Sequence, residues 1–151
     1  MTRFIFILML LGSGTGMQAQ MSATDSVKAA VNLLFTGMKN SDPVTIRSSF
    51  ADSALLQSVV RSRDGGQGLR NESIEDFARQ IASIPKGDAD ERITFEIIRI
   101  DGPLAIVWAP YQFYFKGAFS HCGTDSFQLV KINGTWKIQY LIDTRRKENC
   151  Q

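Results

Sequence analysis

The chain has 151 residues, of which 44% are hydrophobic, and carries 17 Lys and Arg against 15 Asp and Glu. This length is enough for one domain with its own hydrophobic core. A net charge of +2, with no block of basic residues, argues against nucleic acid as a partner. One histidine and two cysteines are too few ligands for a zinc-type site, so no metal is expected.

The first 19 residues have the order of a secretory signal peptide. Arg3 precedes an apolar run from Phe4 to Leu11, and small and polar residues follow up to Ala19. The apolar run is far shorter than the ~20 residues that span a bilayer, and no later segment is long enough. We therefore expect a protein exported to the periplasm or the cell exterior, with no membrane contact after cleavage. Residues 20–151 would form a single mature domain.

Helical signals come first in the mature chain. Apolar residues over 27–38 recur at the spacing of one helix face, which predicts a helix that is capped by Ser22 or Thr24 and ends near Asn40. Asp42-Pro43 then begins a short second helix, with the aspartate as cap and the proline in the first turn.

A strand, a turn and a third helix are predicted next. Residues 54–61 favour a strand, and the glycine-rich stretch 63–68 favours a turn. Ser73–Asp76 has the form of a capping box, and the helix that it begins ends before Pro85. Residues 91–146 then alternate and are rich in β-branched and aromatic types. This order predicts an α+β domain with N-terminal helices packed on the concave face of a curved antiparallel sheet.

Three hairpin turns set a register for the sheet. Asp101-Gly102 and Asn133-Gly134 are favoured two-residue turns, and Gly117-Ala118 is a third candidate. Residues opposite each other across a turn share a face. The three turns agree on one apolar face that should meet the helices: Ile93, Phe95, Ile97, Ile106, Trp108, Phe127, Leu129, Ile138, Tyr140 and Ile142.

One end of that predicted face is polar, which is the usual composition of a ligand pocket. The alternative is a solvated end of the sheet. In the pocket interpretation, aromatic residues supply contact area and polar ones anchor the ligand. The candidate ligand-binding residues are Trp108, Gln112, Tyr114, Tyr140, Thr144 and Arg146, with Phe127 in the floor and His121 and Asp125 among them.

His121 and Asp125 are the candidate catalytic residues. Four residues of strand separate their Cα atoms by roughly 13 Å, too far for a direct hydrogen bond unless Gly123 forms a bulge. They could act at two ends of one substrate, with Asp125 as base and His121 or Tyr114 as acid. The alternative is structural, with Asp125 held by the hydroxyl of Thr144 or Tyr140 and His121 at the pocket rim.

Cys122 should point away from His121, because neighbouring strand residues face opposite sides. In an oxidising compartment, Cys122 and Cys150 are expected to form a disulfide that holds the C-terminal tail against the sheet. An intermolecular Cys150 bridge is the alternative. The predicted back face carries Val107, Tyr111, Phe113, Phe115 and Leu141, too aromatic for a solvated surface. It predicts a homodimer interface, or cover by a loop or the tail.

The layout resembles the nuclear transport factor 2-like superfamily, in particular exported bacterial members such as the putative lumazine-binding group. The resemblance rests on the start helix, the Asp42-Pro43 helix, and the closing Phe127–Ile138 segment, FQLVKINGTWKI. It implies a cone-shaped α+β fold whose curved sheet wraps a pocket, often in a dimer. Members include binding proteins and enzymes, so the fold alone does not assign an activity.

Three functions are consistent with these observations. The first is an exported domain that binds an unknown small molecule in a partly aromatic pocket. The second is a cofactor-independent acid–base enzyme of the dehydratase, isomerase or cyclase type, with Asp125 as base. The third is a protein-interaction module that uses the aromatic back face. None of the three requires a cofactor.

Overall fold

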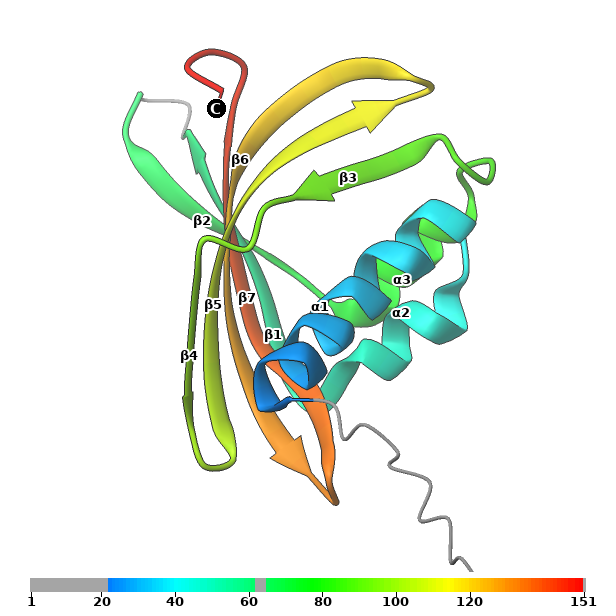
Figure 1. The fold of residues 1–151 in the computed structure, drawn as a ribbon. Coiled ribbons are helices and arrows are strands. Elements are labelled where there is room, and N and C mark those ends of the chain that lie inside the picture. The colour runs from blue at the N-terminus through cyan, green and yellow to red at the C-terminus, as the bar shows by residue number, and fades with distance from the viewer. Residues whose placement is uncertain (1–21, 62–64, 151) are drawn as a thin grey trace, which may run out of the picture.

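The computed structural model describes residues 22–61 and 65–150. Within these ranges the helices are α1 (Ala23–Asn40), α2 (Pro43–Ser49) and α3 (Ile74–Ala82). The strands there are β1 (Phe50–Arg61), β2 (Gln67–Glu72), β3 (Ala89–Ile93), β4 (Ile97–Asp101), β5 (Leu104–Phe115), β6 (Ala118–Ile132) and β7 (Thr135–Arg146). All three helices gather on one side of a strongly twisted sheet (Figure 1). The predicted α+β class is therefore confirmed, whereas the predicted signal segment lies outside the described residues.

The sheet has the strand order β2-β1-β7-β6-β5-β3, and β4 pairs with β5 beyond the end of β3. The pairing of β1 with β7 is parallel, and the other pairings are antiparallel. Strand β2 and the division of the 89–101 region into two strands were not predicted.

Helix α1 is capped by Ser22, one of the two predicted candidates, whose hydroxyl accepts a hydrogen bond from the backbone N–H of Asp25 at 3.1 Å. Its apolar face packs into the concave side of the sheet, where the Phe35 ring meets Phe127 edge-on at 6.2 Å. None of the helices in the described ranges is long and apolar enough to cross a membrane.

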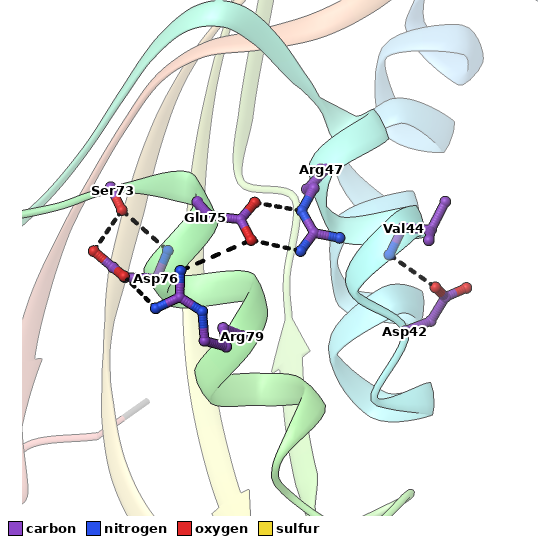
Figure 2. A network of polar contacts seen from close by, with 7 residues as sticks. All are labelled: Asp42, Val44, Arg47, Ser73, Glu75, Asp76 and Arg79. Atoms are coloured by element: carbon purple, nitrogen blue, oxygen red, sulfur yellow. Dashed lines mark hydrogen bonds and ion pairs between the residues drawn. The ribbon is translucent and has the colours of Figure 1, made fainter.

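The short helices α2 and α3 are capped as predicted and tied to each other. Asp42 accepts from the N–H groups of the first turn of α2, and Ser73 accepts from that of Asp76 in α3. Figure 2 shows Arg47 of α2 reaching across to Glu75 of α3, with a bidentate pair of contacts at 2.6 and 2.8 Å. This pairing joins α2 to α3, which forms one wall of the site described below.

The Asn133-Gly134 hairpin is confirmed, with both residues at positive φ. The second turn lies one residue earlier than predicted, at Lys116-Gly117. The third hairpin pairs Asp101 with Leu104, so its central residues are Gly102 and Pro103 rather than Asp101-Gly102.

A bulge at Ser120 changes the facing of β5 and β4. Phe119 pairs with Tyr114, but His121 pairs with Phe113, which leaves Ser120 without a partner in the ladder. An extra residue in one strand moves the side chains of the residues paired beyond it to the opposite face of the sheet. Val107 and Ala109 therefore face the helices, in place of the predicted Ile106 and Trp108.

A second bulge, at Gln139, inverts the end of β7. Ile138 pairs with Leu129 as predicted, but Tyr140 pairs with Gln128, and Gln139 is left over. Its side-chain amide donates to the backbone carbonyl of Ser53 at 3.0 Å, where the β1–β7 register itself shifts. Beyond this point Leu141, Asp143 and Arg145 take the inward positions predicted for their neighbours.

Half of the predicted apolar face is therefore corrected. Phe127, Leu129 and Ile138 are fully buried in the core, and Ile93 and Phe95 pack against it. In contrast, the inward facing predicted for five other residues is wrong because of the two bulges: Ile97, Ile106, Trp108, Tyr140 and Ile142. Gly123 itself is regularly paired with Tyr111 and Arg145 and forms no bulge.

The predicted disulfide between Cys122 and Cys150 is present. It joins the middle of β6 to the segment after β7, where Arg146 also donates to the carbonyl of Asn149 at 3.3 Å. A disulfide is consistent with an oxidising, extracytoplasmic environment.

Candidate functional site

A cavity of about 600 Å³ lies between the concave face of the sheet and helices α1 and α3. Its apolar walls come from both helices and from the end of β5. They consist mainly of Leu34, Phe35, Met38, Phe77, Ile81, Phe113 and Phe115. The polar groups are concentrated on the sheet: Glu91, Tyr111, His121, Asp125, Asp143 and Arg145. Arg70, Glu72 and Gln80 also line it.

Asp143 is the centre of a satisfied polar network. Its Oδ1 accepts from the Ser58 hydroxyl, and its Oδ2 accepts from Arg145 Nε at 2.8 Å and Tyr111 Oη at 3.2 Å. The Asp143 side chain is only 8% exposed, so the guanidinium of Arg145 compensates a charge that burial would otherwise disfavour. Both oxygens of the Asp143 carboxyl group thereby have donors within the sheet.

Gly123 makes room for Tyr111 in this network. A Cβ at position 123 would lie 1.7 Å from the carbonyl oxygen of Thr144 and 2.7 Å from the Tyr111 ring. The bare backbone lets that ring pass over β6, so its hydroxyl donates to the Thr144 carbonyl at 2.9 Å as well as to Asp143. Burial, and then the charge of Asp143, raise the pKa of Tyr111, so it remains a phenol and a donor.

Glu91 and Asp125 form a carboxyl pair beside this network. Asp125 is 3% exposed, and its Oδ2 has no hydrogen-bond partner among the described residues, while its carboxyl group interacts with that of Glu91. Burial, and then the charge of Glu91, raise the pKa of Asp125, while burial raises the pKa of Glu91 to about 7. Two carboxyls in contact in a desolvated site share a proton rather than both ionise.

His121 lines the same cavity as a neutral ring. Burial and the positive charge of Arg145 lower its pKa. The imidazole packs 5.0 Å from the Phe113 ring, and its Nδ1 lies 3.1 Å from the Ser120 hydroxyl. It can therefore offer a ligand one donor or one acceptor but no charge.

The pair predicts an inverse pH dependence of stability. Because the folded-state pKa of Glu91 is raised from 4.5 to about 7, the native state holds more protons than the unfolded state in that window. The free energy of unfolding should therefore fall as the pH rises from 4.5 to 7. Asp125→Asn should stabilise the protein at pH 8 by about 1–3 kcal/mol and flatten this slope in urea unfolding.

The neighbouring Asp90 is the matched control. Its hydrogen bond to Lys39, at 2.9 Å, and its contact with Arg92 lower its pKa, so Asp90→Asn should destabilise at neutral pH. An Asp125→Asn variant that is less stable than the parent at pH 8 and at pH 5 alike would contradict the shared proton.

Of the residues predicted for the site, the structure brings Asp125 and His121 to the cavity. The inward facing predicted for the other six is wrong, because the bulges turn them to the opposite face or away from the cavity. Trp108 is 44% exposed there, Tyr114 donates to Gln112 at 2.9 Å, and Tyr140 donates to Gln57 at 2.6 Å. The hydroxyl of Thr144 accepts from the N–H of Thr124, so neither Thr144 nor Tyr140 holds Asp125.

Gln112 and Arg146 line a second cavity, of about 470 Å³, together with Arg92, Glu96 and Pro110. The back-face prediction is corrected in the same way. Phe113 and Phe115 line the first cavity, and Val107 and Leu141 belong to the core.

The sequence reasoning missed the other polar residues of the cavity, among them Glu91, Tyr111, Asp143 and Arg145. Tyr111 was placed on the back face by the inverted register, and Glu91, Asp143 and Arg145 were not among the candidates. One signal could have been used to find them. With the bulges included, Tyr111, Gly123 and Arg145 lie opposite one another on β5, β6 and β7, which places all three on the face of Asp125.

The family described as putative lumazine-binding matches residues 22–140 of the chain. No curated protein matches the chain in sequence. Among solved structures, an NTF2-like protein of unknown function from Shewanella baltica OS155 superposes with a TM-score of 0.64 at 18% identity, over 85% of this chain and 100% of that one.

Two further structures give the same result. An NTF2-like protein of unknown function from Methylobacillus flagellatus KT has a TM-score of 0.64 at 19% identity, over 87% of this chain and 99% of that one. A protein of unknown function with a cystatin-like fold from Nostoc punctiforme PCC 73102 has a TM-score of 0.65 at 13% identity, over 85% and 96%. At these identities the likeness concerns the fold alone.

Proposed function

Because the chain belongs to the putative lumazine-binding family, within the NTF2-like superfamily, we propose that it is an exported domain that binds a small, flat, mostly apolar molecule in the cavity between α1, α3 and the sheet. Family membership indicates small-molecule binding, and the class of ligand is proposed from the cavity.

The observation that carries this proposal is the composition of the cavity. Its volume of about 600 Å³ lies in the range of ligand sites, and apolar walls face a few convergent polar groups. Oδ2 of Asp125, a buried oxygen with no hydrogen-bond partner in the described part of the chain, belongs to a residue that lines it. Buried polar atoms are nearly always satisfied in native proteins, so an unpaired one in a cavity is a position for a ligand donor.

The proposal can be tested with a panel of flat heterocycles that includes lumazine and amino-substituted pteridines. At least one member should raise the melting temperature of the mature protein and appear as a 1:1 complex in native mass spectrometry. Gln80→Trp, at the cavity lining on α3, should weaken binding at least tenfold by obstruction. Arg79→Trp is the matched control, because Arg79 pairs with Asp76 on the exposed surface and should leave binding intact. Equal binding by both variants would contradict this site.

A second candidate is the cofactor-independent acid–base enzyme, of the dehydratase, isomerase or cyclase class. The observation that favours it is the Glu91–Asp125 pair, since a carboxyl with a pKa of about 7 can donate or accept a proton near neutral pH. With a bound ligand in D2O, such an enzyme should introduce deuterium at a carbon, and Asp125→Asn should abolish exchange while retaining binding. Binding without exchange favours the first candidate.

Export is proposed from the N-terminal sequence and supported by the disulfide. The exported protein should begin at residue 20, within a residue, by intact mass.

Homodimerisation is proposed through the convex face of the sheet. The corrected register places Ile97, Ile106 and Trp108 there as neighbours on β4 and β5, each more than 40% exposed. Light scattering should give twice the chain mass, and Trp108→Lys should yield a monomer, whereas Leu69→Lys on β2 should not. A wild-type monomer at high concentration would contradict the dimer. In the alternative, an interaction module, the same patch binds another protein. Substitutions in the cavity would then leave the binding of that protein unchanged.

A further inference from the structure

The two buried aspartates of the cavity differ in how their oxygens are satisfied. Both oxygens of Asp143 have donors, from Ser58, Tyr111 and Arg145. Oδ2 of Asp125 has none among the described residues, although the Asp125 carboxyl group interacts with that of Glu91. The described residues therefore supply donors to both oxygens of Asp143 but leave one oxygen of Asp125 without a donor.

The positive charge nearest to the pair is already engaged. The Nε of Arg145 lies 2.8 Å from Oδ2 of Asp143, and its Nη2 reaches the Ser58 hydroxyl at 3.4 Å. The charges that act on Glu91 from outside the pair are those of Asp143 and Arg145, which shift its pKa in opposite directions. The pair thus keeps a net negative charge in an apolar cavity, and only its shared proton reduces that charge.

Resting on the proposed function, we propose that the ligand of this cavity carries a cationic nitrogen with at least two N–H donors, of the amidinium or protonated amino-heterocycle class, and that this group replaces the proton between Glu91 and Asp125. The flat body of the ligand then lies against the apolar walls from α1 and α3. Anionic ligands are disfavoured by the same charge.

The chemistry of the two carboxylates fits such a group. A planar cation with two parallel N–H donors can engage both carboxylates at once, with charge-assisted hydrogen bonds and fixed orientation. It supplies the donor that Oδ2 of Asp125 lacks and neutralises a buried charge that is otherwise costly. A neutral primary amide carries no charge and has a carbonyl oxygen where an amidinium has its second nitrogen. It therefore leaves the shared proton on the two carboxyl groups.

Binding of a permanent cation should release the shared proton to solvent. The titratable and charged groups around Glu91 are Asp125, Asp143, Arg145, Tyr111 and His121 on the sheet, with Arg70 and Glu72 on β2. The lining residues of α1 and α3 carry no charge. Since the pKa of Glu91 is about 7, affinity should be about tenfold higher at pH 8 than at pH 6.

The test is calorimetry with benzamidine, benzamide and benzoate, which share a ring and differ in the head group. Benzamidine should bind at least tenfold more tightly than benzamide at pH 8, with benzoate weakest. At pH 6, titrations in two buffers of different ionisation enthalpy should show release of close to one proton per benzamidine.

Variants assign the effect to the pair. Glu91→Gln and Asp125→Asn should each remove the preference for benzamidine and its pH dependence, while Asp90→Asn, on the same strand but in the surface ion pair with Lys39, should retain both. A cooperative thermal transition checks that each variant is folded. Equal binding of benzamide and benzamidine would overturn this inference but leave the proposed function standing, as would binding of heterocycles without any benzamidine binding. If no heterocycle and no benzene probe binds, the proposed function falls as well.

Discussion

Gly123→Ala is expected to destabilise the protein by more than about 4 kcal/mol, or to prevent folding. The reason is steric, because the new Cβ would lie 1.7 Å from the backbone carbonyl oxygen of Thr144. The nearest atom is main chain, so relief requires β6 and β7 to separate. Urea unfolding of the purified variant measures the loss.

Ser126→Ala, on the same strand and half-buried, is the matched control and should change stability by less than about 1 kcal/mol. If Gly123→Ala folds with stability close to the parent, the close packing of Tyr111 over β6 is wrong. The polar network around Asp143 would then need another explanation, since the Tyr111 hydroxyl reaches it only across Gly123.

Cys150→Ser is expected to cost about 3–4 kcal/mol, because the Cys122–Cys150 bond closes a loop over a sequence separation of 28. The bond restricts the unfolded chain and holds the residues after β7 near β6. Thermal or urea unfolding, with and without a reductant, measures the loss.

Two comparisons make this prediction specific. Reduction should destabilise the parent by the same amount as the substitution and should leave Cys150→Ser unchanged. A parent whose mass shows two free thiols before reduction, or whose stability does not respond to reductant, would contradict a structural disulfide.

The helical half of the fold could be predicted because its signals are local. Ser22, Asp42 and Ser73 each cap a helix whose apolar spacing is visible in the sequence, and each cap is present. The Asn133-Gly134 turn is equally local, since both residues readily take positive φ. These features depend on neighbours within four residues.

The facing of the strands could not be predicted as well, because two single-residue bulges have no strong sequence signature. Ser120 and Gln139 are ordinary strand residues, and each is left out of the ladder. The side chain of Gln139, at the second bulge, donates to Ser53, which lies 86 positions away in the sequence. Lysine at positive φ in the Lys116-Gly117 turn is also uncommon, so the turn was placed one residue late.

These errors decided which site residues were found. His121 and Asp125 lie on β6 between the bulge at Ser120 and the correctly placed Asn133-Gly134 turn, so their facing was predicted correctly. The facing of β5 was predicted wrongly because the bulge at Ser120 separates its register from that turn. The facing of the end of β7 was predicted wrongly because it lies beyond the bulge at Gln139. The partner of Asp125 was missed for a related reason: Glu91 enters the site from β3, which reaches the sheet only through β5.

The most direct test of the central claim is a crystal structure of the mature protein grown with benzamidine at pH 8. The account predicts the amidinium between the carboxyl groups of Glu91 and Asp125, within hydrogen-bonding distance of Asp125 Oδ2, and the ring among Phe35, Phe77 and Phe113. Benzamidine bound only in the second cavity, or a cavity between α1, α3 and the sheet that stays closed to it, would contradict the account.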